Sequence, residues 1–269
     1  YYTINIMKLK TYLNESVKNG FLLKWARMPL NVYIAPMKFY SKQGEDFVYR
    51  KMVVKALEEW ENASNGLVQF HLVSTLLESQ INVDWKRVDR SALGHCTYNY
   101  DNLKRLYGAE VSIGLTDGLI HQQYNSEEEV YHTILHEIGH SIGLGHSPYD
   151  TDIMYTPHKY GVVSLSENDK YSVQWLYKLP AGMEVRQIGQ QYSVLTDHDI
   201  DMIISKIDGN DDSIQEENIL FEQDANRDLL NEATNIGNVN KYNMMIQHVG
   251  ISDEMRKFFI NKHRENKGK

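Results

Sequence analysis

The stretch that decides the fold is HTILHEIGHSIGLGHSPYDTDIMY, residues 132–155. Within it His136 and His140 are four residues apart, so on a helix their imidazoles lie on the same face, one turn apart. Gly143 permits the left-handed turn that ends a helix. The chain after that turn can bring His146 back toward the first two histidines. The spacing therefore predicts a helix, a glycine turn and a returning loop.

Three histidines placed in this way indicate a metal site. Three neutral imidazoles leave the fourth position of a tetrahedral ion open, which is the arrangement of catalytic zinc, and zinc lowers the pKa of a bound water to about 7. Glu137 follows the first histidine, so its carboxylate can reach that water without being a ligand. A polar helix face would explain His136 and His140 alone. The full pattern with His146 favours a metal.

The composition excludes several classes of protein. The chain has 269 residues, of which 42% are hydrophobic and 24% charged, as in a globular protein. The formal net charge of −8 argues against the basic face that nucleic-acid binding needs. No run approaches the roughly 18 apolar residues of a membrane helix. We expect no nucleic-acid partner and no membrane span.

Two further features concern the ends and the thiol chemistry of the chain. Cys96 is the only cysteine, which excludes an intramolecular disulfide, and we interpret it as a free thiol in a loop. The sequence starts YYTIN, without an initiator methionine or an apolar signal segment. We therefore expect a processed or truncated N-terminus.

The segments before the histidines predict a sheet backed by helices. Val53, Leu57 and Trp60 fall at helical spacing, and Asn65 with Gly66 ends that helix. Apolar residues suited to strands are expected in four places, while the stretch around SALGHCTYNYD is expected to be rich in loops. The four strands are residues 30–34, 67–73, 81–85 and 109–115.

The segments after the histidines predict helices. Ser166 and Asp169 form a capping-box pattern at the start of one helix, which ends before Pro180. Beyond about residue 184 the polar residues Asn, Asp, Glu and Gln become dense. Apolar residues at helical spacing nevertheless indicate three amphipathic segments there. They are marked by Ile200, Ile203, Ile204 and Ile207, by Leu229 and Leu230, and by Phe258 and Phe259.

The histidine string is where a family resemblance enters. HEIGHSIGLGH, followed by DIMY, resembles the metzincin signature H-E-x-x-H-x-x-G-x-x-H with its methionine turn. Ser147 and the segment MYTPHKY are similar to the matrixin branch. The resemblance covers residues 25–183 and implies a microbial member. It also implies an extracellular or cell-envelope location.

The resemblance implies an α+β fold. The expected domain has a twisted, mostly parallel sheet with an antiparallel edge strand, backed by helices, with the active-site helix under the cleft. We expect residues 1–24 to be an N-terminal extension and residues 25–183 to be the zinc metalloprotease catalytic domain. Residues 184–269 are then a helical C-terminal region.

The resemblance also implies the roles of five residues. His136, His140 and His146 would bind one zinc ion, and Met154 would form a hydrophobic floor beneath it. Glu137 would be the general base and acid of a zinc endopeptidase. A water would attack the peptide carbonyl, and Glu137 would take its proton and pass it to the leaving amine. The expected partner is a protein or peptide substrate.

Four residues are expected to line the substrate pocket. Residues 109–115 are similar in position to the family's edge strand, which pairs with an extended peptide, and they include Ile113 and Gly114. An interior strand is the alternative. His132 precedes the first ligand by one helical turn and would shorten the pocket for the residue after the scissile bond. A packed helix histidine is the alternative there. Tyr160 would shape the outer wall.

The chain departs from the matrixin pattern in four places. It has no PRCGxPD segment, so latency through a thiolate is not expected. It lacks the H-x-D loop of the family's second zinc, so one zinc is expected. Asn168 and Asp169 replace a pair of aspartates, one of which holds the mature N-terminal ammonium, and this puts ammonium docking in doubt. Residues 208–219 suggest a calcium loop but have Ile219 where an acid belongs, so calcium is not expected.

Two alternatives stay open beside the endopeptidase. One is a catalytically weak or latent zinc-binding module that docks a protein partner through its C-terminal helices, although the intact Glu137 favours the enzyme. The other is an enzyme held latent because residues 1–24 or 184–269 occupy its cleft. The sequence does not predict the oligomeric state.

Overall fold

The computed structural model describes residues 9–37, 45–87, 92–115, 126–194, 199–209 and 243–250, the last as backbone. Most strands precede residue 116, and the helices α2 to α5 follow them, with one more strand, β9, after α5. The strands are β1 (Val17–Lys18), β2 (Phe21–Leu22), β3 (Lys24–Trp25), β4 (Leu30–Ile34), β5 (Phe70–Leu72), β6 (Ile81–Arg87), β7 (Ala92–Tyr100), β8 (Arg105–Leu115) and β9 (Asn243–Gly250). The helices are η1 (Leu13–Ser16), α1 (Glu45–Ala63), η2 (Leu76–Glu78), α2 (Glu127–Ser141), α3 (Glu167–Lys178), α4 (Val185–Gln191) and α5 (Ile200–Asp208).

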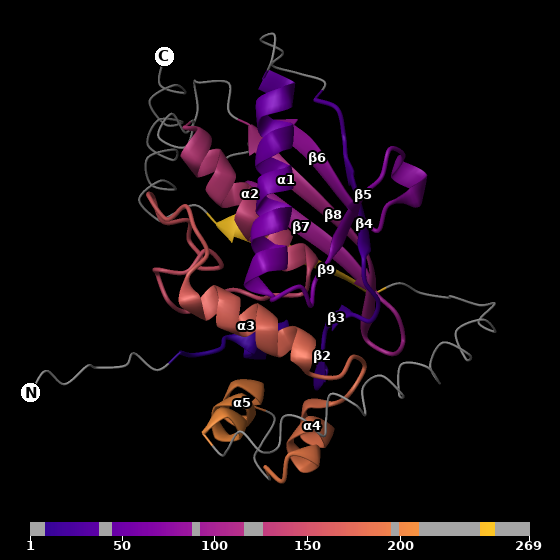
Figure 1. Cartoon of the computed structure of the whole chain (residues 1–269), viewed down its shortest axis with the longest axis vertical. Helices are drawn as coiled ribbons and strands as arrows, with labels where there is room; N and C mark the ends of the chain where they lie inside the picture. The colour runs from indigo at the N-terminus through magenta and orange to yellow at the C-terminus, as the bar shows by residue number, and fades with distance from the viewer. Residues whose placement is uncertain are drawn as a thin grey trace, which may run out of the picture.

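Seven of these strands form one mostly parallel sheet. Its order is β5-β4-β6-β8-β7-β9, and β3 also pairs with β8. The pairs β4–β5, β4–β6, β6–β8 and β3–β8 are parallel. The pairs β7–β8 and β7–β9 are antiparallel and lie at one edge. The predicted α+β fold, with antiparallel pairing at one edge and helices behind the sheet, is confirmed (Figure 1).

Strand β8 corrects one prediction, because it is not an edge strand. Its residues pair with β6 on one side, where Trp85 is opposite Ile113, and with β7 on the other, where Gly94 is opposite Ile113. Both rows of backbone hydrogen-bonding groups on β8 are therefore used within the sheet. An extended peptide cannot pair with residues 109–115, and the interior-strand alternative is correct.

Strand β7 corrects a second prediction, because residues 92–100 were expected to be loop. Leu93, Cys96, Tyr98 and Tyr100 are buried and alternate with less buried residues from His95 onward. This period of two is the pattern of a strand with one face in the core. Glycine, threonine and asparagine interrupt the hydrophobic alternation in the sequence, so the period is visible only once burial is known.

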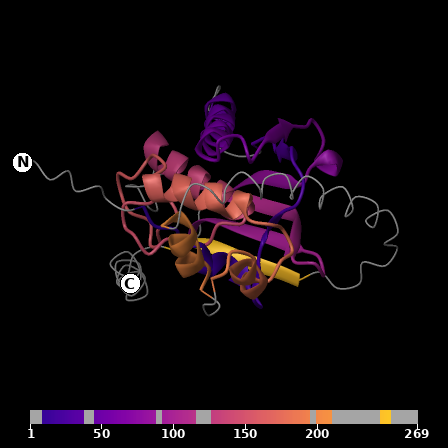
Figure 2. The same cartoon turned by 60° about the horizontal axis from the view of Figure 1, so that its bottom comes forward.

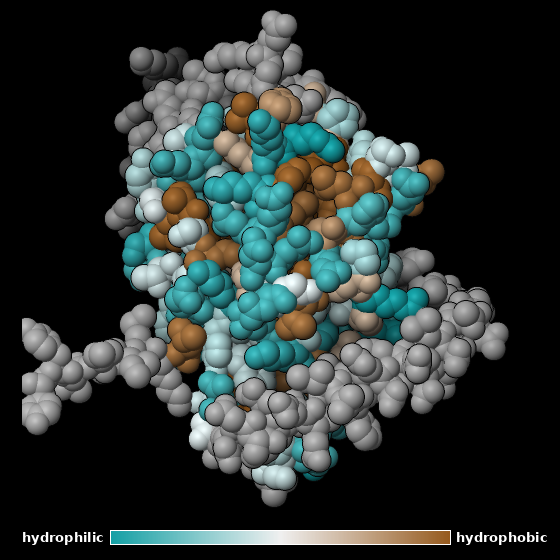
Figure 3. Space-filling model, viewed as in Figure 1, coloured by the Kyte–Doolittle hydropathy of each residue, from teal (hydrophilic) through white to brown (hydrophobic). Residues whose placement is uncertain are grey.

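Helix α1 covers the sheet and packs against α2 and α3 (Figure 1). Val53, Leu57 and Trp60 are buried on its inner face, as their spacing predicts. Asn65 and Gly66 adopt positive φ angles of 55° and 78° directly after the helix, in the left-handed region that ends helices. Figure 3 shows hydrophilic residues along the middle of the face that carries α1, with hydrophobic residues gathered at its upper right.

Helices α3 and α5 form where the sequence predicts them. The Ser166 side chain accepts a hydrogen bond from the Asp169 N–H, and Asp169 returns one to the backbone of Ser166, which completes the capping box. In α5, Ile200, Ile203 and Ile204 are fully buried. The segments marked by Leu229 and Phe258 lie outside the described residues.

The C-terminal region also contains a strand, which its polar composition did not predict. Strand β9 pairs with β7 from Asn243, opposite Tyr100, to Gly250, opposite Ala92. Figure 2 shows β9, in yellow, along the edge of the sheet. The residues from 184 onward are therefore not all helical. Among the described residues, no helix combines the length and the apolar character needed to cross a membrane.

The hydrophobic core continues across the boundaries expected at residues 24 and 184. Tyr12 and Leu13 from the N-terminal segment belong to the same buried cluster as Ile188 and Ile203 from α4 and α5. The Val185 N–H also donates to the Gly20 carbonyl at 2.8 Å. The division of the chain into three parts stays a prediction that this shared core does not favour.

The shared core predicts that α5 unfolds with the rest of the domain. Ile203→Ala should destabilise the protein by about 2–5 kcal/mol, since truncating a buried isoleucine loses burial and leaves a cavity. Met202→Ala, at an adjacent side chain that is 49% exposed, should change stability by no more than about 0.5 kcal/mol. Urea unfolding followed by far-ultraviolet circular dichroism measures both. A separate early transition in Ile203→Ala would show that α5 is an independent unit.

Candidate metal centre and active site

Helix α2 carries two of the three histidines and is buried along most of its length. Its N-cap, Ser126, accepts a hydrogen bond from the Glu129 N–H, and three glutamates in the first turn face the positive end of the helix dipole. Every residue from Glu129 to Ser141 is buried. Polar side chains on such a helix need partners inside the protein.

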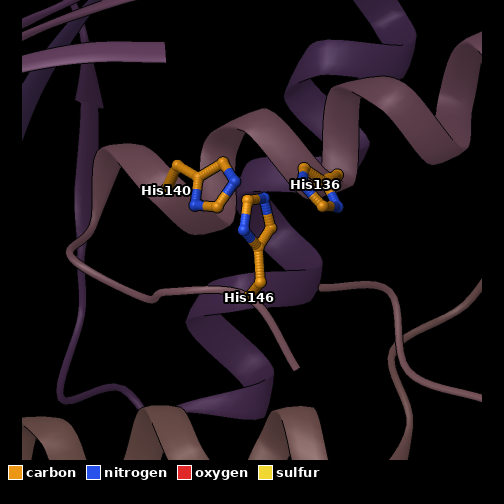
Figure 4. A group of neighbouring side chains, drawn as sticks. All are labelled: His136, His140 and His146. Carbon is orange, nitrogen blue, oxygen red and sulfur yellow. The ribbon is translucent and has the colours of Figure 1, made fainter. Parts of the chain in front are cut away.

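The turn after α2 returns the chain as the glycine spacing predicts. Gly143 has a φ angle of +99°, and a Cβ built there would lie 2.5 Å from the carbonyl oxygen of Leu23. Both the backbone angle and the close approach require glycine. The loop then brings His146 alongside α2. Figure 4 shows His146 pointing from this loop toward His136 and His140 on the helix.

The three imidazoles are close enough to share one ion. One nitrogen from each of His136, His140 and His146 lies within 4.8 Å of the other two. Tetrahedral zinc with nitrogen ligands at about 2.0–2.1 Å places those nitrogens roughly 3.4 Å apart, which small side-chain rotations can reach. The predicted histidine cluster is therefore present in the described part of the chain.

The hydrogen bonds of two imidazoles leave the correct nitrogen for a metal. Nδ1 of His136 is 2.7 Å from the carbonyl oxygen of Ile153, and Nδ1 of His140 is 2.8 Å from that of Leu144. A carbonyl only accepts, so each Nδ1 carries the proton and each Nε2 keeps its lone pair. Nε2 of His136 is buried and accepts no hydrogen bond. These donors fit zinc.

Burial keeps the imidazole of His136 neutral. Desolvation is the main cause that lowers its pKa well below the usual value, and the neighbouring His140 and His146 act in the same direction. Metal ligation requires the neutral form of histidine. The site therefore holds this ligand ready at pH values where a free imidazole would bind a proton.

Glu137 follows His136 on α2 and packs against strand β7. Its side chain is fully buried, and a Cβ added to Gly94 would lie 2.8 Å from its Oε1 and 2.8 Å from Cγ2 of Thr133. Glycine at position 94 thus leaves the space that the carboxylate occupies. The sequence alone did not identify Gly94, because a single glycine in a polar stretch carries no signal of what packs on it.

Met154 packs against the helix that carries His136 and His140, and its role as a floor beneath a metal stays a prediction. It is fully buried, and a Cβ at Gly139 would overlap its sulfur and lie 2.9 Å from Cζ2 of Trp60. The Met154 carbonyl accepts a hydrogen bond from the Ser147 N–H at 2.8 Å. This bond closes the loop that follows the third histidine. Met154 and Trp60 therefore pack so closely against α2 that position 139 has room for glycine but not for a larger residue.

Asp169 ties the methionine turn to the N-terminal segment. One carboxylate oxygen accepts the Tyr12 hydroxyl at 2.6 Å, and the other accepts the Ile153 N–H at 2.8 Å. The Tyr12 hydroxyl thus occupies one oxygen of Asp169. Since the Ile153 carbonyl accepts from His136, Asp169 connects Tyr12 to a histidine of the candidate metal centre through one residue, Ile153.

The four residues proposed to line the pocket differ in how exposed they are. His132 is 1% exposed, and its Nδ1 donates to the Val162 carbonyl, so it lies behind the loop of residues 158–162. Tyr160 in that loop is 67% exposed. Ile113 is fully buried in the sheet, and Gly114 is half-buried. A pocket role for these residues stays a prediction.

A buried contact between His158 and Glu129 holds the loop of residues 158–162 against α2, and no sequence pattern predicts it. His158 contacts the carboxylate of Glu129 through Nε2, and both side chains are at most 2% exposed. Glu129 also accepts the Gly161 N–H at 3.0 Å. The two residues are 29 positions apart, and nothing in their local sequence links them.

Two other predictions concern the lone cysteine and the acidic turn. Cys96 is buried in β7 rather than in a loop, and burial raises the pKa of its thiol well above the usual value, with Glu137 and Glu110 adding to the rise. Asp208 accepts the Tyr171 hydroxyl at 2.6 Å. The rest of the suggested calcium loop, residues 210–219, lies outside the described residues.

The sequence comparisons agree with the geometry. The family model described as matrixin matches residues 24–178. A protein of Heliothis virescens ascovirus 3e, named "Putative matrix metalloproteinase", is 26% identical over 163 residues. That alignment covers 51% of this chain and 33% of the viral protein, so the chain spans about a third of this relative's length.

The buried imidazoles predict how stability depends on pH. Burial, with a smaller effect of His158, lowers the pKa of His132 to about 3. An unfolded histidine has a pKa of about 6.5, so between these values the unfolded chain binds a proton that the folded chain does not. Metal-free protein should therefore lose up to about 1.4 kcal/mol per pH unit from this group as the pH falls below about 6.5.

Urea unfolding with a chelator present, at about pH 7.5, 6 and 5, measures this loss. His132→Gln should show a shallower dependence on pH than the parent protein. His71→Gln, at an exposed histidine, should not. Identical slopes for His132→Gln and the parent protein would contradict the expectation.

Proposed function

We propose that this chain, which belongs to the matrixin family, is a zinc-dependent endopeptidase acting on protein or peptide substrates. One observation carries the proposal: three histidine nitrogens lie within 4.8 Å of one another, and the glutamate that follows the first of these histidines is fully buried. A structural zinc site is usually closed by a fourth side chain, whereas three ligands leave a position for water or substrate.

His136, His140 and His146 would hold the zinc ion. When bound, zinc would act as a Lewis acid toward the substrate carbonyl and make a water molecule nucleophilic near neutral pH. The Nδ1 hydrogen bonds of the two helix histidines hold their rings so that Nε2 faces the shared point. Met154 supports the helix from below through Gly139.

Glu137 would move the proton. Three imidazoles would hold the metal, so the carboxylate that follows His136 in sequence would act on the water and would not be a ligand. It would accept the proton of the attacking water at one carboxylate oxygen and deliver it to the nitrogen of the leaving amine. Gly94 leaves room for this carboxylate, and the buried surroundings keep bulk water from competing for the proton.

The alternative of a silent docking module finds less support. Of the C-terminal helices proposed to dock a partner, α5 is described, and its apolar residues Ile200, Ile203 and Ile204 are buried in the shared core. A binding module also has no need of a buried glutamate at position 137. An extracellular or cell-envelope location stays a prediction from the family.

Glu137→Ala tests the proposed chemistry. It should keep the zinc and lose cleavage by about 10²–10⁴-fold, the usual range for a general acid or base. Digestion of a peptide library, read by mass spectrometry, measures activity and the residues preferred around the cut. Zinc content by elemental analysis shows that the ion is retained.

Glu167→Ala is the matched control, because Glu167 is an exposed glutamate that pairs with Lys170 on α3. It should cleave as the parent protein does. Equal cleavage by Glu137→Ala and Glu167→Ala would remove Glu137 from the mechanism. A parent protein that binds zinc but cuts no peptide in the library would count against the endopeptidase itself.

A further inference from the structure

We propose that Glu15 is a positioning residue for the third metal ligand, His146; this rests on the proposed zinc site. The carboxylate of Glu15 accepts the backbone N–H of His146 at 3.1 Å. The same oxygen lies 3.6 Å from Nδ1 of the imidazole, an ion-pair distance longer than a hydrogen bond. One side chain therefore contacts both the backbone and the ring of a single ligand.

In the other two histidines, Nδ1 also faces an oxygen atom, which orients the ring. Nδ1 of His136 faces the Ile153 carbonyl and Nδ1 of His140 faces the Leu144 carbonyl. Glu15 supplies a charged oxygen on the same nitrogen of the third ring. A carboxylate there favours the proton on Nδ1 and makes Nε2 a better metal ligand.

The backbone fixes Glu15 in this place. A Cβ built on Gly145 would lie 2.5 Å from Cβ of Glu15 and 3.0 Å from its carbonyl carbon. The Gly145 N–H also donates to the Ser16 hydroxyl at 2.9 Å. The residue before the ligand is thus packed directly on η1, which requires glycine at position 145.

Helix α5 in turn holds η1. The carboxylate of Asp201 accepts the N–H groups of Leu13 at 2.7 Å and Asn14 at 3.1 Å. The Asn14 side chain also accepts the Ile200 N–H at 3.0 Å. Both η1 and α5 lie outside the matrixin match of residues 24–178. The third ligand is therefore supported by parts of the chain that the family match does not include.

Zinc affinity tests this role on the inactive Glu137→Ala background. Glu15→Ala should bind zinc roughly 10-fold more weakly in chelator competition, at the lower end of the effect of such supporting residues, because the Glu15 side chain is 59% exposed. Glu15→Gln keeps an oxygen that can accept the backbone N–H of His146, so its zinc affinity should lie between those of Glu15→Ala and the parent. The visible spectrum of the cobalt-substituted protein should shift in Glu15→Ala.

Glu167→Ala, at an exposed glutamate on α3, is the control and should match the parent in affinity and spectrum. Equal zinc dissociation constants for the Glu15 variants and Glu167→Ala would overturn the proposal. If Glu15→Ala does not fold without metal, the isosteric Glu15→Gln decides. If His146→Ala binds zinc as tightly as the parent, the zinc site itself fails, and the proposed function fails with it.

We also infer that β9 fills, from within the chain, the sheet edge that a peptide substrate would use; this too rests on the proposed function. Strand β7 carries Gly94, which packs against Glu137, and its inner edge pairs with β8. Its outer edge pairs with β9, with His95 opposite His248 and Thr97 opposite Ile246. Helix α2 contacts both β7 and β9.

An extended peptide that reaches Glu137 by adding to the sheet would need the backbone groups on this outer edge of β7. Those groups pair with β9, so substrate and β9 compete for them. The consequence is a latent state, in which the apparent affinity for peptide is reduced in proportion to the fraction of molecules that have released β9.

Two proline variants of the full chain test this competition. Successive N–H groups of a strand point to opposite sides, so only one of Ile246→Pro and Gln247→Pro removes a bond to β7. That variant should cleave a library peptide roughly 10-fold faster than the parent at low substrate, and the other should change less. Hydrogen–deuterium exchange of the β7 amides should rise in the same variant.

Parent-like cleavage and exchange in both variants would overturn the inference. Faster exchange without cleavage of any peptide would support the strand contact and count against the endopeptidase. The two failures are therefore distinguishable. Added Glu137→Ala in the released variant should abolish cleavage, which excludes a contaminating protease.

Discussion

The metal centre depends on one repeated interaction between the helix α2 and the chain that returns along it. His140, His136 and His132 each turn Nδ1 toward a backbone carbonyl, from Leu144, Ile153 and Val162 in that order. The helix is buried, so each imidazole needs such a partner. The same three bonds orient the rings and fix three successive parts of the returning chain. The hydrogen bonds that satisfy the buried histidines of α2 are thus the same bonds that orient the histidine rings of the site.

The motif made the centre of the molecule predictable. The spacing of His136, His140 and His146, with Gly143 between, correctly predicts a helix, a left-handed turn and a returning loop, because each of these depends on neighbouring residues. The capping box of α3 and the isoleucine stripe of α5 are confirmed for the same reason. Local periodicity and local capping are visible in a single sequence.

The supports around the centre were not predictable in the same way. The sequence predicts an edge strand at residues 109–115, which is wrong because strand order depends on pairing between distant segments. Glu15 and His146 are 131 positions apart, and Glu129 and His158 are 29 apart. No spacing rule connects such residues. The polar composition after residue 184 likewise hid β9, whose pairing with β7 joins two segments nearly 150 residues apart.

The carbonyl partners of the imidazoles also bear on which ions the centre can accept. Hydrogen bonds to carbonyls orient the rings of His136 and His140 in the folded protein, so metal binding need not order these two side chains. Three imidazole nitrogens suit zinc and other borderline ions that accept imidazole. They suit calcium poorly, because calcium requires six to eight oxygen ligands in a flexible shell. The choice between zinc and calcium then depends on how the protein orients the imidazole rings as well as on which residues are ligands.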